Sequence, residues 1–310
     1  MNQEIFNKYR KEYGAWKSYI NGNYIVNINL EDGTKERIQP DDDADFIPEF
    51  PESIDINLTM KCGGGCSYCY QGCTPDGEEG DIRNAKFFDT IRPYTEVALQ
   101  VNELDHLDLI WLLEKLKKNH VIVNITVNQI HFMSKRDIIK HLVDNELIKG
   151  LGISYITPSE KFLNEVFNYP NAVLHVINGI ISEQNLKPLY DNELKVLILG
   201  YKDLGRGIDY REKKDSSIIE NQKWLYDNLN DIVGHFKVLS FDNLAIEQLN
   251  VRRLLSEKQW DNFYMGDDGT FTFYIDVVTK MFGKSSLEKP VLPMMDDVAK
   301  MFKIIREEKK

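Results

Sequence analysis

Cysteine is almost missing from this sequence, and its distribution says more than its number. The chain has 310 residues but only 4 cysteines, and none of them lies outside residues 62–73. A disulfide-stapled secreted scaffold would spread paired cysteines through the chain, so this distribution argues against one. Thiols gathered in one short segment instead indicate a site for a soft metal.

Long apolar runs and a secretion signal are missing as well. The sequence contains no run of about 18 or more apolar residues, which excludes a hydrophobic transmembrane helix. Residues 1–8 lack the basic-then-apolar pattern of a signal peptide. We therefore expect a cytoplasmic protein without a membrane partner, in the reducing compartment that clustered free thiols need.

An excess of basic residues is the third missing feature. The chain has 38 Lys and Arg residues against 49 Asp and Glu residues, and its formal net charge is −11. Nonspecific affinity for nucleic acid comes largely from clustered Lys and Arg, so we do not expect a nucleic-acid partner. With 42% hydrophobic and 28% charged residues, the composition is that of a globular chain able to form one large α/β domain with additions.

The cysteines lie in a segment that directly follows a predicted strand. Residues 54–60 alternate apolar and polar side chains, and residues 62–69 then read CGGGCSYC. The spacing is C-x3-C-x2-C at Cys62, Cys66 and Cys69, and Cys73 comes four positions later. A short glycine-bearing loop lets several thiolates converge on one metal centre.

Two other uses of these thiols have to be compared with a cluster site. A zinc site usually pairs C-x2-C knuckles across a long spacer, and this contiguous segment has no spacer. Two adjacent disulfides in so short a loop are geometrically awkward. The role of Cys73 stays open between an inert thiol and a proton or hydrogen donor near the substrate.

The cysteine spacing, with Tyr68 just before the third cysteine, resembles the cluster loop of the radical S-adenosylmethionine (SAM) superfamily. The resemblance implies that Cys62, Cys66 and Cys69 hold a 4Fe–4S cluster, and that the backbone at Tyr68 contacts the adenine of SAM. Three protein ligands leave one iron open for the amino and carboxylate groups of SAM, as catalytic metal sites keep one position open.

The same resemblance implies an activity. In this superfamily the reduced cluster cleaves SAM to methionine and a 5′-deoxyadenosyl radical, which abstracts hydrogen from a substrate. An external electron donor such as flavodoxin or ferredoxin reduces the cluster. The lead-in Leu58-Thr59 and the Tyr-bearing loop look most like members that modify peptides and proteins, so a peptide is the first substrate expected.

The fold expected for residues 51–245 is α/β, because predicted strands and helices alternate along them. Counting the strand before the cysteines gives six or seven strands, fewer than the eight that close a TIM barrel. We therefore predict an open partial (β/α)6 TIM-like barrel, which is also the superfamily's fold. The expected strands cover 97–101, 121–127, 151–156, 172–177, 194–199 and 236–241, and the expected helices cover 82–91, 107–118, 135–147, 158–167, 183–190 and 216–233.

Extensions are predicted at both ends of this barrel. Residues 1–50 read as a helix over 1–16, a β-hairpin or three-stranded meander, and an acidic linker over 41–45. Residues 246–310 read as a β-hairpin over 263–275 with an Asp-Gly turn, followed by a terminal helix over 294–308. No cysteine lies in this second extension, so the auxiliary-cluster domain of many peptide-modifying relatives is not expected there.

Polar residues recur at the carboxyl ends of the predicted strands, where parallel α/β folds bind their ligands. Asn102 and Glu103 follow the second strand and are candidates for the amino-acid end of SAM. Asn128, Ser154 and His175 lie at or near the ends of the next three strands and are candidates for the ribose or the substrate. Taken singly, each is more typical of a helix cap or a loop, but as a set they resemble a lined pocket.

One departure from the superfamily pattern concerns the second strand. Relatives usually carry a Gly-Gly-Glu type motif there, and this chain has Gln-Val-Asn-Glu over residues 100–103. Larger side chains would crowd a close approach of the backbone to SAM. Two functions therefore stay open: a radical SAM enzyme, and a noncatalytic iron–sulfur or metal-binding protein serving in regulation or interaction.

Overall fold

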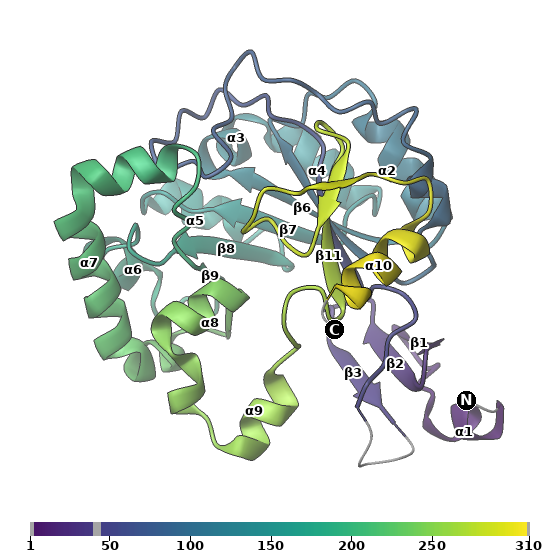
Figure 1. The fold of residues 1–310 in the computed structure, drawn as a ribbon. Helices are drawn as coiled ribbons and strands as arrows, with labels where there is room; N and C mark the ends of the chain where they lie inside the picture. Colours follow the sequence, from purple (N-terminus) through teal and green to yellow (C-terminus); the bar gives the residue numbers. More distant parts are fainter. Residues whose placement is uncertain (1–2, 40–44, 309–310) are drawn as a thin grey trace.

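The computed structural model describes residues 3–39 and 45–308, and its main feature is a 10-stranded sheet (Figure 1). The strand order is β10-β9-β8-β7-β6-β5-β4-β11-β12-β13. Every neighbouring pair from β10 across to β11 is parallel, and the last two strands add antiparallel. The strands are β4 (Ser53–Asn57), β5 (Glu96–Asn102), β6 (Ile122–Asn128), β7 (Gly150–Ser154), β8 (Ala172–Ile177), β9 (Lys195–Leu199), β10 (Val238–Phe241), β11 (Thr272–Asp276), β12 (Met281–Gly283) and β13 (Leu292–Pro293).

This sheet confirms the predicted α/β class with parallel strands. The strands from β4 to β10 correspond to the seven that the sequence indicated, and helices connect most of them. Among the described residues β10 pairs only with β9, so the sheet does not close into a barrel. The arrangement agrees with a partial TIM-like fold.

The predicted hairpin over 263–275 is wrong. Residues 263–271 form no strand, and β11 enters the main sheet parallel to β4, in register from Thr272↔Ser53 to Asp276↔Asn57. An isolated hairpin would leave much of its apolar surface in water, whereas β11 covers an edge of β4 and buries Phe273 and Ile275. The antiparallel partner of β11 is β12, in a stretch that the sequence indicated as a loop.

Helices cover the outer face of the sheet (Figure 1). On β5 the residues Val97, Leu99 and Val101 are buried in the main hydrophobic core, and the residues between them point to the opposite, concave face. That alternation places the polar residues of each strand inside. The helices are α2 (Leu109–Lys118), α3 (Gln129–Ser134), α4 (Arg136–Asp144), α5 (Glu160–Val166), α6 (Glu183–Leu186), α7 (Arg206–Ile232), α8 (Asn243–Leu249), α9 (Glu257–Phe263) and α10 (Val298–Glu307).

Several predicted helix limits need correction. The helix expected over 82–91 is only a 3-10 turn at Lys86–Thr90, because Phe87 and Phe88 are neighbours in sequence and both fully buried. Helix α7 begins ten residues before the expected 216, in a polar stretch without apolar periodicity. Helix α5 begins at Glu160 rather than at 158, and Ser159 is its N-cap.

The N-terminal extension is a small sheet that docks on the main one. Helix α1 (Gln3–Tyr9) ends earlier than the predicted residue 16, and β1 (Trp16–Asn21), β2 (Tyr24–Asn29) and β3 (Lys35–Ile38) form the expected antiparallel meander. Most of the predicted acidic linker, residues 41–44, lies outside the described residues. Whether the three predicted segments act as domains remains a prediction, because β11 of the last segment belongs to the main sheet.

A buried ionic group joins the two sheets. The carboxylate of Glu52, just before β4, is 1% exposed and accepts hydrogen bonds from Arg37 Nε at 2.8 Å and the Tyr24 hydroxyl at 2.6 Å. Lys35 Nζ lies 3.5 Å from Glu52 and 2.6 Å from Glu96 on β5. These contacts hold β2 and β3 against the amino-terminal ends of β4 and β5.

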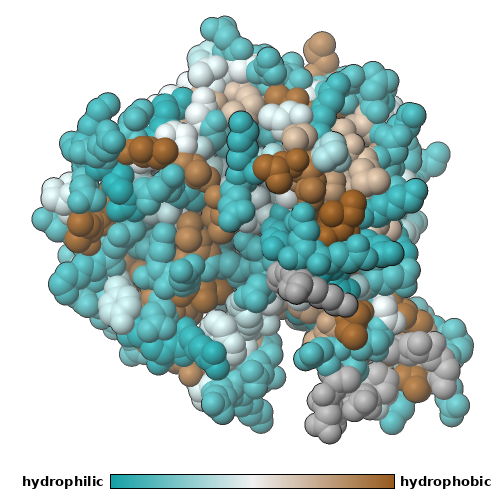
Figure 2. Space-filling view, in the orientation of Figure 1, coloured by the Kyte–Doolittle hydropathy of each residue, from teal (hydrophilic) through white to brown (hydrophobic). Residues whose placement is uncertain are grey.

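Hydrophilic side chains dominate the face shown in Figure 2, and apolar ones are seen there in separate groups. No helix in the described ranges combines the length and the apolar character needed to cross a membrane.

Candidate functional site

The cysteine loop follows the carboxyl end of β4, which lies between β5 and β11 in the sheet. Cys62 N donates to Thr74 O at 2.8 Å, and an isolated bridge between Lys61 and Thr74 closes the base of the loop. Cys62, Cys66 and Cys69 are partly exposed, whereas Cys73 is buried. Three thiols are therefore accessible to a metal centre, and the fourth points into the protein.

Two glycines of the loop let polar side chains of the sheet approach the cysteines. A Cβ added at Gly63 would lie 2.9 Å from Glu103 Oε1, and one added at Gly64 would lie 2.9 Å from Asn128 Nδ2. An added side chain would displace the ends of Glu103 and Asn128, so glycine at both positions lets these two side chains lie where they do. The glycines between Cys62 and Cys66 are thus needed for contact with the ends of β5 and β6.

Asn128 connects the sheet to the cysteine ligands. Its Nδ2 donates to Cys66 Sγ at 3.6 Å, and its Oδ1 accepts from the backbone of Ile130 and caps α3. Asn128 pairs in register with Ser154 on β7, and Ser154 pairs with His175 on β8. Three residues predicted from separate strand ends therefore form one row across the concave face.

His175 is the most enclosed member of that row. Its ring lies over Gly152, where an added Cβ would be 2.5 Å from His175 Cε1. Burial lowers the pKa of His175 to about 4, so the imidazole is neutral at physiological pH. It can offer a hydrogen bond to a ligand but no positive charge.

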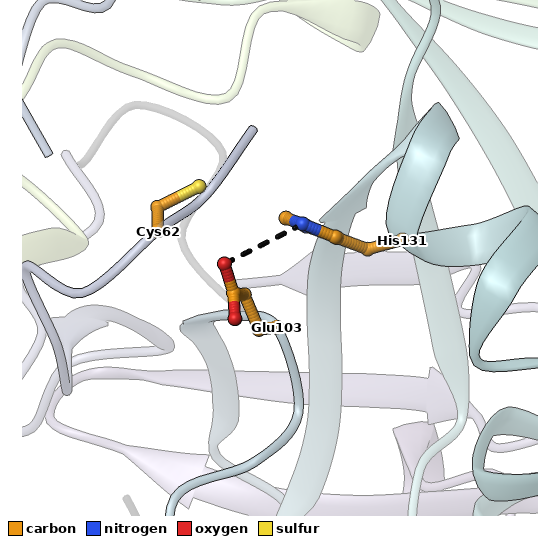
Figure 3. Close-up of side chains that lie close together, drawn as sticks. All are labelled: Cys62, Glu103 and His131. Carbon is orange, nitrogen blue, oxygen red and sulfur yellow. Dashed lines mark ion pairs between the residues drawn. The ribbon is translucent and has the colours of Figure 1, made fainter. Parts of the chain in front are cut away.

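Glu103 lies beside the first cysteine (Figure 3). Its Oε1 accepts a hydrogen bond from the backbone of Gly63 and lies 3.6 Å from His131 Nε2. Cys62 Sγ, one Glu103 oxygen and one His131 nitrogen lie within 4.8 Å of one another. Nδ1 of His131 is buried and has no hydrogen-bond partner among the described residues.

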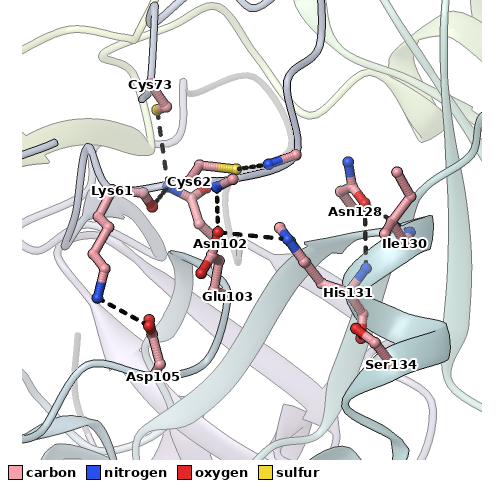
Figure 4. A network of polar contacts seen from close by, with 12 residues as sticks. Lys61, Cys62, Cys73, Asn102, Glu103, Asp105, Asn128, Ile130, His131 and Ser134 are labelled. Carbon is pink, nitrogen blue, oxygen red and sulfur yellow. Dashed lines mark hydrogen bonds and ion pairs between the residues drawn. The ribbon is translucent and has the colours of Figure 1, made fainter. Parts of the chain in front are cut away.

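Asn102 supports the loop from below (Figure 4). Its Nδ2 donates to Thr59 O at 3.1 Å, to Lys61 O at 3.0 Å and to Cys73 Sγ at 3.8 Å. Its backbone has a φ of 46°, next to an irregularity in the pairing of β5 with β6. Asparagine tolerates this left-handed conformation, so it can replace a glycine of the motif that this chain lacks.

Arg206 is a residue of the site that sequence reasoning missed. At the start of α7, its Nε donates to Cys66 O at 3.0 Å and its Nη1 to Cys73 O at 2.8 Å. Its backbone N–H donates to Cys69 O at 3.0 Å. These three hydrogen bonds hold the cysteine segment in place.

The thiols differ in their acidity. A hydrogen bond from Cys73 lowers the pKa of Cys69 to about 5, and the same bond raises the pKa of Cys73 far above its usual range. Burial raises the pKa of Cys62 and of Cys66. Cys69 is therefore the more acidic thiol of this pair, and Cys73 is the less acidic one.

Tyr68 points its side chain away from the other site residues. Its ring packs edge-to-face on Tyr210 of α7, with ring centroids 5.7 Å apart, and burial raises its pKa to about 12. Only its backbone remains for a ligand contact, as the resemblance implies. That contact stays a prediction.

The spacing of the thiols fits a cluster better than a single ion. A tetrahedral zinc site with Zn–S bonds of about 2.3 Å needs its sulfur atoms roughly 3.8 Å apart. Within the described ranges, Cys62, Cys66 and Cys69 are not all within 4.8 Å of one another; only Cys62, Glu103 and His131 form such a set. Three partly exposed thiols on one loop match the number of protein ligands of a 4Fe–4S cluster that keeps one iron open.

Comparisons with known proteins show a shared fold. No family model and no curated protein matches the chain. The structural neighbours are crystal structures of SuiB from Streptococcus suis, a radical SAM enzyme. SuiB bound to its precursor peptide SuiA matches with a TM-score of 0.61 and 11% identity, covering 93% of this chain and 87% of SuiB. SuiB bound to S-adenosylmethionine matches with a TM-score of 0.59 and 11% identity, covering 88% of this chain and 82% of SuiB. SuiB alone matches with a TM-score of 0.56 and 10% identity, covering 91% of this chain and 86% of SuiB.

Proposed function

We propose that this chain is a radical SAM enzyme that modifies a peptide or protein. The observation that carries the proposal is the arrangement of the cysteines: three partly exposed thiols follow the carboxyl end of β4, and a fourth is buried. Such a set offers a 4Fe–4S cluster three ligands and leaves one iron open. The fold shared with SuiB supports the same assignment.

Cys62, Cys66 and Cys69 would hold the cluster. When bound, the cluster supplies the electron that cleaves SAM to methionine and a 5′-deoxyadenosyl radical able to abstract hydrogen from a substrate. Arg206 and Asn102 fix the backbone of the loop, and Asn128 donates a hydrogen bond to the Cys66 sulfur. These contacts orient the ligands and limit the access of water.

Glu103 is our candidate for the amino group of SAM. Its carboxylate lies beside Cys62, a proposed cluster ligand, and His131 lies 3.6 Å from it. Asn102 uses its side-chain amide on the loop, which leaves Glu103 as the better placed of the two predicted residues. Asn128, Ser154 and His175 form the row proposed for the ribose or the substrate.

A peptide is the first candidate substrate because SuiB was crystallised with a precursor peptide and shares the fold over most of both chains. SAM itself is proposed on the same basis, from SuiB crystallised with it. An external donor such as flavodoxin or ferredoxin completes the proposal, since the reaction requires a reduced cluster.

The test is anaerobic reconstitution with iron and sulfide, reduction with dithionite, and chromatography of 5′-deoxyadenosine after addition of SAM. Cys66→Ala should lose both the cluster and the product. Cys73→Ala is the matched control, because it removes a cysteine of the same loop that is not a proposed ligand; it should keep the iron and sulfide content. A parent protein that forms a cluster but releases no 5′-deoxyadenosine would favour the noncatalytic alternative.

That alternative has one specific observation in its favour. Cys62, Glu103 and His131 lie close enough together to hold a single metal ion. Metal analysis separates the two functions: one tightly bound zinc per chain that is lost in His131→Ala, with no sulfide, would replace the cluster assignment. Iron and sulfide in equal amounts that survive His131→Ala would exclude the single-ion site.

A further inference from the structure

Asp55 lies at the middle of β4, with β5 on one side and β11 on the other. It pairs in register with Ala98 and Tyr274, so its side chain points to the concave face of the sheet. Its neighbours Ile54 and Ile56 point the other way and are buried. Asp55 is nevertheless exposed. Because Asp55 lies on an inner strand and is still exposed, its side chain is open to the concave face of the sheet.

The carboxylate of Asp55 has no partner. Among residues 3–39 and 45–308 it makes no hydrogen bond and no ion pair, although protein surrounds it closely enough that burial raises its pKa to about 6. An ionisable group in such surroundings costs stability unless it is paired. Natural chains keep costly groups mainly where function needs them.

One cation faces the same interior without neutralising Asp55. Lys202, three residues after β9, donates from Nζ to Ser286 Oγ at 2.8 Å and lies 4.0 Å from the centre of the Tyr70 ring. No ion pair within 4.0 Å joins it to a carboxylate of the described residues. Tyr70 directly follows Cys69, so this group of side chains lies next to the cysteine loop.

Two more carboxylates act on this region, and both already have partners. Asp242 caps α8 by accepting from Ala245 N at 2.7 Å and from Gly200 N at 2.9 Å. Asp268 accepts from Asn243 Nδ2 at 2.6 Å. Three carboxylates therefore face one ammonium group, and the interior around Asp55 attracts positive charge.

We propose that Asp55 binds a cationic group of the substrate, an ammonium or guanidinium of a peptide side chain, inside the partial barrel. This inference rests on the proposed function and adds the class of residue that the enzyme recognises. The exposed, unpaired carboxylate can accept a charge-assisted hydrogen bond from such a group. Lys202, Ser286 and Tyr70 contact one another beside the cysteine loop.

The test uses the full-length protein and three blocked tripeptides, Gly-Lys-Gly, Gly-norleucine-Gly and Gly-Glu-Gly, with binding measured by ligand-observed NMR. We expect the lysine peptide to bind the parent at least about tenfold tighter than the other two, and Asp55→Asn to remove that preference. Asp261→Asn, the same substitution on the exposed surface of α9, should keep it. Equal binding of the lysine peptide by parent and Asp55→Asn, a preference for the glutamate peptide, or no binding at about 10 mM would each overturn the proposal.

A second readout separates this inference from the proposed function. Asp55→Asn should take up as much iron and sulfide on reconstitution as the parent does, because Asp55 is not a proposed cluster ligand. If the parent itself releases no 5′-deoxyadenosine, the proposed function has failed, and the peptide measurement still decides the role of Asp55. If Asp55→Asn alone loses cleavage while it keeps its cluster, Asp55 acts on the cofactor and the proposal is overturned.

Discussion

The side-chain amide of Asn128 lies 3.6 Å from the sulfur of Cys66, while its carbonyl oxygen caps helix α3. One side chain thus connects a cluster ligand to a helix end, and the helix fixes its orientation. A hydrogen bond to a cluster sulfur stabilises the reduced, more negative state. Asn128 should therefore influence the reduction potential and not only the structure of the loop.

Asn128→Asp tests this directly, because aspartate keeps the capping oxygen and loses the amide donor. We expect the midpoint potential of the reconstituted cluster to fall by about 40–60 mV, the one-electron equivalent of ~1 kcal/mol. The melting temperature should change little since the cap remains. An EPR-monitored redox titration measures the shift, and an unchanged potential would show that the 3.6 Å contact has no electronic role.

Arg206 should determine whether the loop is ready to receive a cluster. Arg206→Ala removes two hydrogen bonds to the carbonyls of Cys66 and Cys73, and we expect the free energy of unfolding to fall by about 2–4 kcal/mol. Iron and sulfide content after reconstitution should fall with it. Arg211→Ala is the matched control, because Arg211 lies one turn further along α7 and pairs with exposed Asp203. A loss of cluster in both variants alike would point to α7 as a whole.

Glu103 should govern the affinity for SAM. Glu103→Gln keeps the shape but removes the charge that would face the amino group, so we expect the Kd for SAM to rise by roughly 10- to 100-fold, or ~1.5–3 kcal/mol. Isothermal titration with the reconstituted protein measures this. Asp105→Asn is the control, since that carboxylate pairs with exposed Lys61 nearby. Equal affinities for SAM in Glu103→Gln and the parent would remove Glu103 from the site.

Sequence reasoning found the parts of the site that one short segment or one strand end encodes. The spacing of Cys62, Cys66 and Cys69 indicated the ligand set that is proposed above, and the alternation of strands and helices predicted the parallel strands. The row of Asn128, Ser154 and His175 followed from the rule that parallel strands end at the same edge.

The rest depended on contacts between segments far apart in the chain. Arg206 reaches the carbonyls of Cys66 and Cys73 across more than a hundred residues, and nothing local distinguishes it from another arginine at a helix start. Strand β11 was predicted to form a local hairpin because its pairing with β4 is a long-range choice. The sequence identified Asp55 only as one of the polar residues in an alternating strand. The fold shows that these polar residues lie on the concave face of the sheet.

Glu52 should make stability depend on pH in the acid range. Burial alone would raise its pKa, but Lys35 and Arg37, together with the Tyr24 hydroxyl, lower it below the ordinary 4.5. A carboxyl with a lowered folded-state pKa contributes its full stability above the unfolded pKa and loses it as pH falls through the folded value. Urea unfolding of the parent should therefore weaken progressively below about pH 4.5.

Glu52→Gln should remove that part of the pH dependence and destabilise the protein at neutral pH by about 3–5 kcal/mol, because Lys35 and Arg37 lose their buried partner. Glu36→Gln is the control, since Glu36 pairs with Lys11 near the surface and should cost less than about 1 kcal/mol. Parallel pH profiles for Glu52→Gln and the parent would show that other carboxylates dominate acid unfolding.

Asp55→Asn should raise the stability of the folded protein at pH 8, whereas Glu52→Gln should lower it. The folded-state pKa of about 6 is above the ordinary 3.8, so the folded protein loses stability as pH rises from 3.8 through 6. Water in the open interior screens much of that cost, which leaves ~1 kcal/mol at pH 8. Asp55→Asn should then melt about 2–3 °C higher than the parent at pH 8 and no higher at pH 4. A lower melting temperature at pH 8 would mean that the folded protein itself uses the charge of Asp55, and that the carboxylate is not kept free for a ligand.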